Sequence, residues 1–310
     1  MNPLFQMKKI LLFAVLLFST VSVDAQLLWR ISGNGCKDSS YLFGTYHYET
    51  FEFIPKVPGL IDAIQNVDVI YGEVNIEDFN TLPSQDMSFQ HAPADSTIDK
   101  LFAYKLLTYE DCMKADLMLS INCNTTLEQK KFLKPKAITE TITMALQKEY
   151  ITNKDLFYTL DMGIQEIGRN RGIESKSLET VDDQLDVIKA MYEVPIIEQA
   201  EELAKICRDF NDFAFYYMAV VAAYQSQNFN IIRNIFFNSK YGYDEDNPEA
   251  ELLFYKRNRN WMEKITQILP NQRALIVVGV GHFFGEDGLL NMLEEKGYTV
   301  EPVIVDNQYP

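Results

Sequence analysis

The stretch that decides the fold is LIVVGVGH, from Leu275 to His282. An apolar run rich in β-branched residues ends here in a glycine, two further residues and a histidine, and the segment that follows has a helical pattern. The stretch YLFGTYH, from Tyr41 to His47, has the same arrangement near the other end of the chain. A helix pattern and a further strand pattern follow each of them, VIYGEV in the first case and VEPVIV in the second. The two ends of the chain therefore resemble each other.

A strand–helix–strand unit normally joins two parallel strands by a right-handed crossover. If both units share one sheet, both Gly-x-x-His segments leave the carboxyl ends of parallel strands, where open α/β sheets place their sites. Between the units, from about residue 80 to 265, apolar residues recur at three- and four-residue intervals, which predicts helices. The sequence therefore predicts an α/β fold. Its mixed or mainly parallel sheet is formed from N- and C-terminal βαβ units, with a large helical insert between them.

The first 25 residues have the pattern of a signal peptide. Lys8 and Lys9 precede a short apolar stretch, and Val23 and Ala25 fit the small-residue positions before a cleavage site. An uncleaved N-terminal anchor is the alternative, although the apolar stretch is short for a span of roughly 20 residues. We expect residues 26–310 to form one domain. It would be exported to the periplasm or secreted from a bacterium, with no stable membrane insertion after cleavage.

The charge composition of the chain limits the classes of partner that it can bind. The chain has 310 residues and a formal net charge of −16, which disfavours nucleic acid and anionic membranes, because both attract cationic surfaces. Export permits disulfides, and the four cysteines allow three full pairings. We expect a bridge between Cys112 and Cys123, since both lie in one polar segment.

The glycines of the opening stretch also suggest a dinucleotide-binding loop. Gly279, Gly281 and Gly285 are spaced one residue too widely for that fingerprint, and Phe284 stands where its third glycine belongs. The sequence given also ends about twenty-five residues later, without the rest of a dinucleotide-binding fold. We therefore reject this interpretation.

His47 and His282 are the candidates for chemistry, since each follows a glycine by three residues at a predicted strand end. We expect Gly44 and Gly279 to free the backbone for a turn and to leave room there, so that each imidazole projects over the sheet edge. Neutral imidazole binds zinc, manganese or iron, and it transfers protons near neutral pH. A lone histidine is more often a hydrogen-bonded structural residue. His91, which has no matched context, is expected at the surface.

Glu73 is the third candidate, because it ends the strand VIYGEV behind the first Gly-x-x-His unit. Two imidazoles and one carboxylate would make a divalent metal site with an open position for water. Glu73 could instead be the base that activates such a water. Alternatively, Glu73 is an exposed residue at a strand end and has no role in the site.

A set of sequence blocks resembles the TraB/PrgY/GumN family, which is related to the Tiki metalloproteases. In order along the chain, the blocks are YLFGTYH, VIYGEVN, LDMGIQEIGRNRG, SLETVDDQ, KRNRNW and VVGVGHFFGEDGLLNMLEEKGYTV. Each block alone is weak, but the ordered set spans nearly the whole chain after the signal region. The resemblance implies a compact α/β domain with a helical insert. In the Tiki branch it implies a peptidase that depends on manganese, cobalt or zinc.

The resemblance also assigns residues. It implies that His47, His282 and Glu73 bind the metal, and that Glu73, Arg257 and Glu179 act in catalysis, with Asn258 and Gln184 beside them. Arg257 could bind a substrate carboxylate or stabilise an oxyanion, or it could be an ordinary surface arginine, and Glu179 could be an exposed cap. Many relatives carry Gly-Asp where this chain has Gln227 and Asn228, a departure that concerns only the detail of the helical insert.

Three functions remain open at this point. The leading hypothesis is an exported metal-dependent hydrolase that acts on peptide bonds of a peptide or protein substrate. The second is a binding protein that sequesters a peptide, iron or haem in the same crevice without turnover. The third is a structural envelope protein, which predicts that His47 and His282 lie well beyond about 10 Å from each other, because shared ligation needs bonds near 2 Å.

Overall fold

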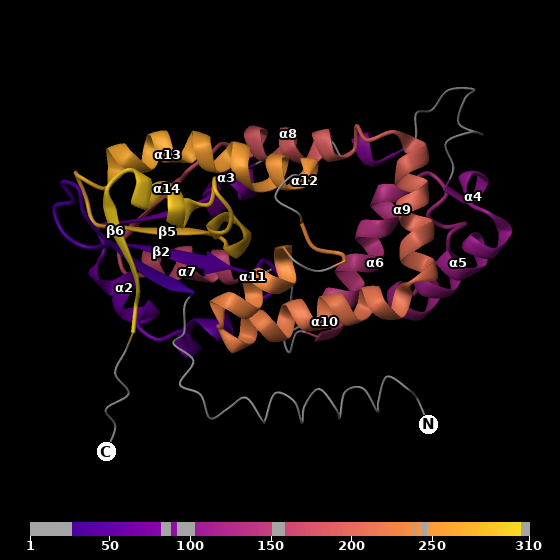
Figure 1. Ribbon diagram of the computed structural model, residues 1–310, viewed down its shortest axis with the longest axis horizontal. Coiled ribbons are helices and arrows are strands. Elements are labelled where there is room, and N and C mark those ends of the chain that lie inside the picture. The colour runs from indigo at the N-terminus through magenta and orange to yellow at the C-terminus, as the bar shows by residue number, and fades with distance from the viewer. Residues whose placement is uncertain are drawn as a thin grey trace, which may run out of the picture.

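The computed structural model describes residues 27–81, 88–91, 103–150, 159–237, 240–243 and 247–304. The predicted signal peptide lies outside these residues. Within them a six-stranded sheet occupies one end of an elongated molecule, and a group of helices occupies the other end (Figure 1). The strands are β1 (Leu28–Gly33), β2 (Ser40–Thr45), β3 (Val69–Gly72), β4 (Glu174–Ser177), β5 (Ala274–Gly279) and β6 (Tyr298–Pro302).

The sheet has the strand order β4-β3-β5-β2-β1-β6. Strands β4, β3, β5 and β2 pair in parallel, and β1 runs antiparallel to both of its neighbours, β2 and β6. The N-terminal unit therefore contributes β1, β2 and β3, and the C-terminal unit inserts β5 between β2 and β3. The predicted mixed α/β sheet built from both ends of the chain is confirmed.

The pairing of β2 with β5 sets the place of the two Gly-x-x-His segments. Gly44 lies opposite Val278 and Thr45 lies opposite Gly279 in parallel register, so both segments leave neighbouring strands at the same edge. Strand β5 is buried along almost its whole length, as expected for a central parallel strand covered on both faces. The expectation that both segments leave one sheet side by side is confirmed.

Helices cover both faces of the sheet, with α13 and α14 on one side and α2 and α7 on the other (Figure 1). Helix α7 begins after the N-cap Thr159, and α8 begins with a capping box of Thr180 and Asp183, both of which satisfy free N–H groups of the first turn. The helices near the sheet are η1 (Phe51–Lys56), α2 (Leu60–Asn66), α3 (Ile76–Thr81), α7 (Leu160–Asn170), η4 (Glu251–Tyr255, a π-helix), α13 (Lys256–Ile268), η5 (Val280–Phe283) and α14 (Leu289–Glu295).

The remaining helices extend away from the sheet and confirm the large helical region. Helices α8 and α10 run along the two long sides of the molecule and lead to α5, α6 and α9 at the far end (Figure 1). These helices are η2 (Ser88–Gln90), α4 (Ala103–Leu106), α5 (Tyr109–Cys123), α6 (Pro135–Tyr150), α8 (Val181–Met191), α9 (Ile196–Arg208), α10 (Phe210–Ser226), α11 (Phe229–Phe237) and α12 (Pro248–Ala250).

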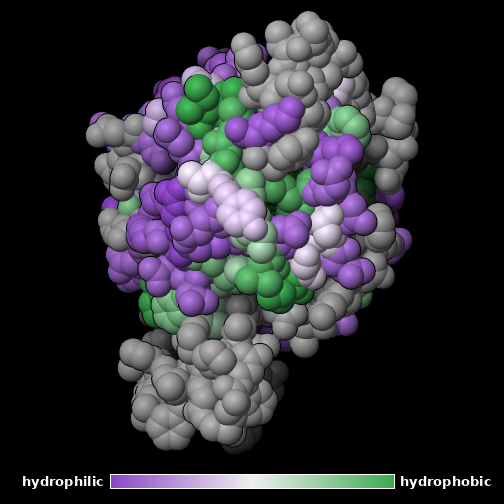
Figure 2. Space-filling view, turned by 90° about the vertical axis from the view of Figure 1, so that its right-hand side faces the viewer, coloured by the Kyte–Doolittle hydropathy of each residue, from purple (hydrophilic) through white to green (hydrophobic). Residues whose placement is uncertain are grey.

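Two buried apolar clusters stabilise these parts. The larger cluster surrounds the sheet, and the smaller one joins α5, α6, α9 and α10. Tyr217 and Tyr241 pack against both clusters and so connect them. At the far end, Tyr109, Met113 and Leu117 of α5 are exposed at every fourth position, and hydrophobic residues lie among hydrophilic ones on that face (Figure 2).

Three details differ from or bear on the expectations. Strand β4 lies inside the region predicted to be helical and adds an edge to the sheet; its sequence ESKS has no apolar alternation that would indicate a strand. Residues 213–224 are almost all apolar and form most of helix α10, and they include all of the buried residues of that helix. Among the described residues, none of the helices is both long enough and apolar enough to cross a membrane.

The expected bridge between Cys112 and Cys123 is wrong, because none of the four cysteines, all of which lie in the described residues, forms a disulfide. Both residues lie on the single helix α5. Eleven positions at 1.5 Å per residue separate them by about 16 Å along the helix axis, far beyond the Cα spacing of a disulfide. The polar segment that contains both cysteines is a regular helix.

We expect thiol labelling to show that the protein contains no disulfide. Cys207 is buried, and burial raises its pKa to about 12, so it should resist alkylation in the folded protein because the thiolate is the reactive form. After unfolding in denaturant without reductant, mass spectrometry should find four alkylated cysteines in each chain. A chain that takes up only two labels after unfolding would contradict the free-cysteine arrangement.

Candidate functional site

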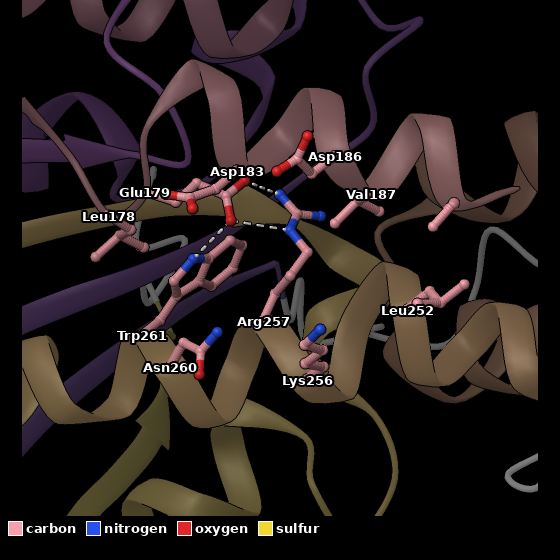
Figure 3. Close-up of a pocket in the computed structure, with 11 residues that line it drawn as sticks. Leu178, Glu179, Asp183, Asp186, Val187, Leu252, Lys256, Arg257, Asn260 and Trp261 are labelled. Atoms are coloured by element: carbon pink, nitrogen blue, oxygen red, sulfur yellow. Dashed lines mark hydrogen bonds and ion pairs between the residues drawn. The ribbon is translucent and has the colours of Figure 1, made fainter. Parts of the chain in front are cut away.

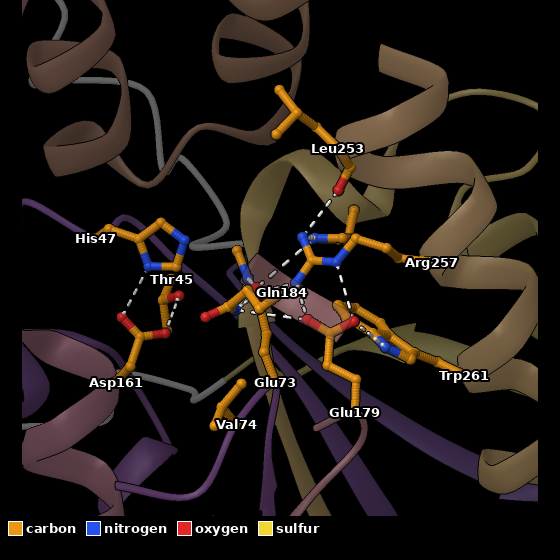
Figure 4. Close-up of polar contacts among 12 residues, drawn as sticks. Thr45, His47, Glu73, Val74, Asp161, Glu179, Gln184, Leu253, Arg257 and Trp261 are labelled. Atoms are coloured by element: carbon orange, nitrogen blue, oxygen red, sulfur yellow. Dashed lines mark hydrogen bonds and ion pairs between the residues drawn. The ribbon is translucent and has the colours of Figure 1, made fainter. Parts of the chain in front are cut away.

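Three strand ends bring the candidate residues to one edge of the sheet (Figure 4). His47 lies two residues after β2, and Glu73 directly follows β3. His282 lies in the short helix η5, which follows β5 without a break. Because β5 lies between β2 and β3 in the sheet, the central segment lies between the other two candidates.

Gly279, the last residue of β5, lies at the centre of this group. A Cβ atom built on it would be 3.4 Å from Glu73 Oε1, 3.6 Å from His47 Nε2 and 3.7 Å from His282 Cδ2. The two imidazole atoms therefore lie no more than the sum of the last two distances apart, about 7 Å. This proximity contradicts the separation that the structural envelope hypothesis predicts.

The role expected of the two glycines needs a correction. Neither Gly44 nor Gly279 has a positive φ, so glycine is not required there to turn the backbone. Instead, both glycines leave space, and at Gly44 the space is too small for a larger residue. A Cβ on Gly44 would lie 2.9 Å from the ring of Phe283, and one on Gly279 would fill the centre of the candidate site. The expectation that these glycines leave room at the strand ends is confirmed.

His282 is buried and its imidazole has a fixed orientation. The Nδ1 atom lies 2.6 Å from Asn258 Oδ1, while the Asn258 amide nitrogen donates to the carbonyl oxygens of His282 and Asp287. The amide oxygen must therefore accept the Nδ1 proton, which leaves the lone pair on Nε2. That Nε2 atom lies 3.6 Å from Glu73 Oε1. This arrangement is the one that metal-binding histidines commonly show.

His47 is exposed, and its ring is oriented in a similar way. Its Nδ1 lies 3.3 Å from Asp161 Oδ2, and the other oxygen of Asp161 accepts a hydrogen bond from Thr45 Oγ1 at 2.5 Å. Asp161 lies in the first turn of α7, on the face of the sheet opposite α13. With its Nδ1 directed at a carboxylate, His47 presents Nε2 to the centre of the site.

Arg257 of α13 joins two buried carboxylates from different strand ends (Figure 4). Its Nη2 donates to Glu73 Oε2 at 2.5 Å and to Glu179 Oε1 at 2.6 Å, and its Nη1 lies 3.2 Å from His282 Nε2. Trp261 donates to the other oxygen of Glu179 at 3.1 Å. Arg257 thus occupies one oxygen of Glu73, and the other, Oε1, faces the imidazoles and accepts from the Gly279 N–H.

The charges of this group follow from its surroundings. Burial would raise the pKa of Glu73, but Arg257, the two histidines and the Gly279 N–H hold it well below its usual range. Burial lowers the pKa of His282 to about 3. Loss of hydration would lower the pKa of His47, but the Asp161 carboxylate outweighs this and raises it to about 9. Near neutral pH and without a metal, Glu73 is therefore ionised, His282 is neutral and His47 is protonated, so an ion would have to displace the Nε2 proton of His47.

The donor set fits a divalent cation in its chemistry. Beside Gly279, Glu73 Oε1 and His47 Nε2 lie 3.4 and 3.6 Å from the position of a Cβ atom, whereas His282 presents Cδ2 there at 3.7 Å and has its Nε2 beside Glu73 and Arg257. Bonds of about 2.1 Å would require the side chains to move closer together and the ion to replace Arg257 as the partner of His282 Nε2. Among the described residues, no three His, Cys, Asp or Glu side chains already stand in a metal-holding arrangement.

The structure brings together every candidate except His91, which is exposed and pairs with Leu133 in the backbone. Gln184 also approaches the carboxylates of Glu73 and Glu179. Sequence reasoning did not single out Asp161, Thr45 or Trp261. Asp161 opens the block LDMGIQEIGRNRG, and its acidic position at a helix start is the only sequence signal for it.

A family model described as the TraB/PrgY/gumN family matches residues 27–302, which include all of the strands and all of the site. The chain belongs to the TraB/PrgY/gumN family. Two curated proteins share short segments with this family member. The "Metalloprotease TIKI homolog" of Amphimedon queenslandica is 38% identical over 61 residues, which are 19% of this chain and 12% of the relative. "Metalloprotease TIKI2" of Danio rerio is 38% identical over 52 residues, which are 16% and 10% of the two chains.

These matches therefore cover about a tenth of the length of each relative. They link this TraB/PrgY/gumN protein to proteins named as metalloproteases, in agreement with the resemblance found in the sequence. No solved structure matches the chain significantly.

Proposed function

We propose that this protein is an exported, metal-dependent hydrolase that cleaves peptide bonds at the sheet edge. One observation carries the proposal: two imidazoles, oriented by Asn258 and Asp161, and the Oε1 atom of an ionised Glu73 come together beside Gly279. This donor set, from three neighbouring strand ends, is suited to a divalent ion with open coordination positions. Manganese, cobalt and zinc are the candidates.

In this proposal His47, His282 and Glu73 hold the ion through Nε2, Nε2 and Oε1. The ion would polarise the substrate carbonyl and make a water molecule acidic enough to react near neutral pH. Asp161 and Asn258 orient the two imidazoles, as carboxylates and amides behind metal ligands commonly do. The hydrogen bonds of Asn258 to two carbonyl oxygens prevent its amide from flipping and so maintain the tautomer of His282.

Arg257 has a separate role. Its side chain is nine-tenths buried and contacts both Glu73 and His282, so its positive charge lies beside the reacting centre in a poorly hydrated environment. A fixed cation there stabilises the negative charge that develops on the carbonyl oxygen of a substrate. Glu179 and Trp261 hold the guanidinium from behind, which makes them positioning residues.

Peptides are the proposed substrates because the related segments belong to proteins named as metalloproteases. Export is proposed from the N-terminal pattern of two lysines, a short apolar stretch and small residues. Sequestration of a peptide without turnover would use the same crevice. Incubation with a peptide library followed by mass spectrometry separates the two functions, since a pure binder leaves every peptide intact.

Replacing Gly279 with alanine tests the site while keeping all of its donors. The new methyl group would lie at ordinary contact distances of 3.4 to 3.7 Å, and the backbone of Gly279, with φ −55 and ψ 136, accepts alanine. The variant should therefore fold normally. Its methyl group would occupy the space that the ion needs, and we expect its affinity for manganese or zinc to fall at least about a hundredfold, as measured by equilibrium dialysis.

The exposed His91 provides the control, because H91A removes a histidine outside the site. H91A should bind metal as the unmodified protein does. If G279A retains full metal affinity, the ion is not held between the three strand ends. If peptide cleavage persists in excess chelator, the proposal of a metal is wrong.

A further inference from the structure

A pocket of about 370 Å³ lies between helix α8 and the segment formed by η4 and α13 (Figure 3). Its volume is at the small end of the range for ligand sites, roughly 300 to 1,000 Å³. Arg257 and Glu179 line this pocket, and the guanidinium of Arg257 that pairs with Glu179 also pairs with Glu73 on its other side. The pocket is therefore directly behind the candidate active site, separated from it by one guanidinium group.

The charges of the pocket are divided between its two walls. On the α8 side Asp183 and Asp186 line it, and on the α13 side Lys256 and Asn260 line it (Figure 3). A ligand that carries a positive and a negative group at its two ends would match this division. A ligand with one sign of charge would meet a like charge on one wall.

Hydrogen-bonding capacity is left over on both walls. Within the described residues, Lys256 has no ion-pair partner in the structure, and the Asn260 amide makes no hydrogen bond. On the opposite wall Asp186 has only a long contact of 3.5 Å with Lys189. Asp183 uses Oδ2 to cap its own helix at Thr180. An arriving ammonium or carboxylate group would therefore add charge-assisted hydrogen bonds without breaking strong ones.

Apolar side chains also line the pocket, Val187 on the α8 side and Leu252 and Trp261 on the other (Figure 3). Leu178 and Ala190 line it as well. An aliphatic side chain of modest size can lie against these residues while charged ends reach the two walls, and its burial adds roughly 25 cal/mol for each Å² removed from water. This combination excludes a bare ion as the preferred occupant.

We propose that the pocket between α8 and α13 binds a short zwitterionic ligand, a free amino acid or a dipeptide with an aliphatic side chain. Its ammonium group contacts Asp183 and Asp186, and its carboxylate contacts Lys256 and Asn260. The proposal concerns binding alone, so its test is independent of the proposed metal-dependent hydrolysis. If both are true, the pocket lies where one end of a cleaved peptide would leave the active site past Arg257.

Trp261 reports directly on this pocket, since the chain has only two tryptophans. In a W29F protein the fluorescence comes from Trp261 alone. We expect the dipeptide Ala-Leu to change this fluorescence saturably, with mass spectrometry confirming that the peptide stays intact. Acetylating its amino group or amidating its carboxylate should each weaken binding about tenfold, because each removes one charge-assisted contact. Leucine and Ala-Ala-Leu then define the length that fits.

Two substitutions locate the binding on the two walls. D186N should weaken binding of Ala-Leu about tenfold while leaving Ala-Leu with an acetylated amino group unaffected. K256Q should likewise weaken binding of Ala-Leu about tenfold while leaving Ala-Leu with an amidated carboxylate unaffected. D182N on the same turn of α8 and K205Q on α9 are the matched controls and should bind as W29F does, with unfolding curves confirming that all variants fold.

Each remaining outcome overturns the proposal. An absence of saturable change at millimolar Ala-Leu means that the pocket does not take such a ligand. Equal binding of the free and blocked peptides means that charge division does not select the ligand. If D186N and K256Q bind as their controls do, the ligand lies elsewhere near Trp261.

Discussion

Replacing Arg257 with alanine is expected to lower the free energy of unfolding by about 3–5 kcal/mol, the usual result of removing one partner from a buried ion pair. The side chain is 10% exposed, and those of Glu73 and Glu179 are each 7% exposed. Without the guanidinium, both carboxylates would be left buried near each other with no charge partner. Denaturation by urea, monitored by circular dichroism, measures the loss.

The pH dependence of this loss has a definite sign. In the unmodified protein Arg257 contributes to holding the pKa of Glu73 well below its usual range. In R257A the pKa of a buried, unpaired carboxyl rises above its unfolded value of about 4.3. The protonated form then becomes the stable one, so the variant loses stability as the pH rises through that value. The deficit of R257A should be smaller at about pH 4 than at pH 8.

Arg259 supplies the control two residues away on the same helix. Its ion pairs with Glu251 and Asp287 are about half exposed, and exposed pairs contribute about 0–1 kcal/mol. R259A should therefore unfold almost as the unmodified protein does. A stability of R257A within 1 kcal/mol of R259A would contradict the account of Arg257 as the charge that keeps the site together.

The second large effect is expected for the variant that lacks both motif histidines, H47A/H282A. If the histidines hold the ion that activates water, peptide cleavage should fall at least about a thousandfold, to the background of the assay. The exposed His47 should cost little stability, whereas truncating the buried His282 leaves the Oδ1 atom of Asn258 without its donor, which costs about 1–3 kcal/mol. Cleavage of a peptide library, scored by mass spectrometry, measures activity.

The variant N258A separates activity from stability. It removes the same buried hydrogen bond, together with the two that Asn258 donates to carbonyl oxygens, and leaves both imidazoles present, so its stability should fall by at least as much. We expect N258A to retain measurable cleavage and H47A/H282A to retain none. A double variant that cleaves peptides at the unmodified rate would show that another part of the chain performs the reaction.

The arrangement of the sheet could be predicted because its central strands have clear sequence patterns. Strand β5 is an uninterrupted apolar run, and the two Gly-x-x-His segments repeat the same order of strand, turn and helix. Right-handed crossovers then leave few ways to join them. Strand β4 could not be predicted, because its four residues are polar and lie at the sheet edge, where pairing to β3 rather than burial forms the strand.

The sequence predicted the three candidate metal ligands, but it did not predict the residues that orient them. His47, Glu73 and His282 follow strand ends, so the topology alone brings them together. Asp161 is 114 residues from its partner His47, and no local pattern encodes that contact. The role of Gly279 was predicted only in part, because a backbone turn and a close approach both call for glycine, and only the surrounding side chains distinguish them.

The error at Cys112 and Cys123 has a simple physical origin. Helix α5 is only weakly amphipathic, with apolar residues exposed at positions such as Tyr109 and Ile121. Its sequence therefore lacks the clear stripe that indicates a helix. Once the segment is helical, the rise of the helix keeps the two thiols apart regardless of the redox conditions.

The most direct test of the central claim is the metal stoichiometry of the purified protein, measured by mass spectrometry of its metals after dialysis against manganese, cobalt and zinc. We predict one tightly held divalent ion in each chain of the unmodified protein and of H91A, and none in H47A/H282A. Equal metal content in the double variant and the unmodified protein would contradict the account.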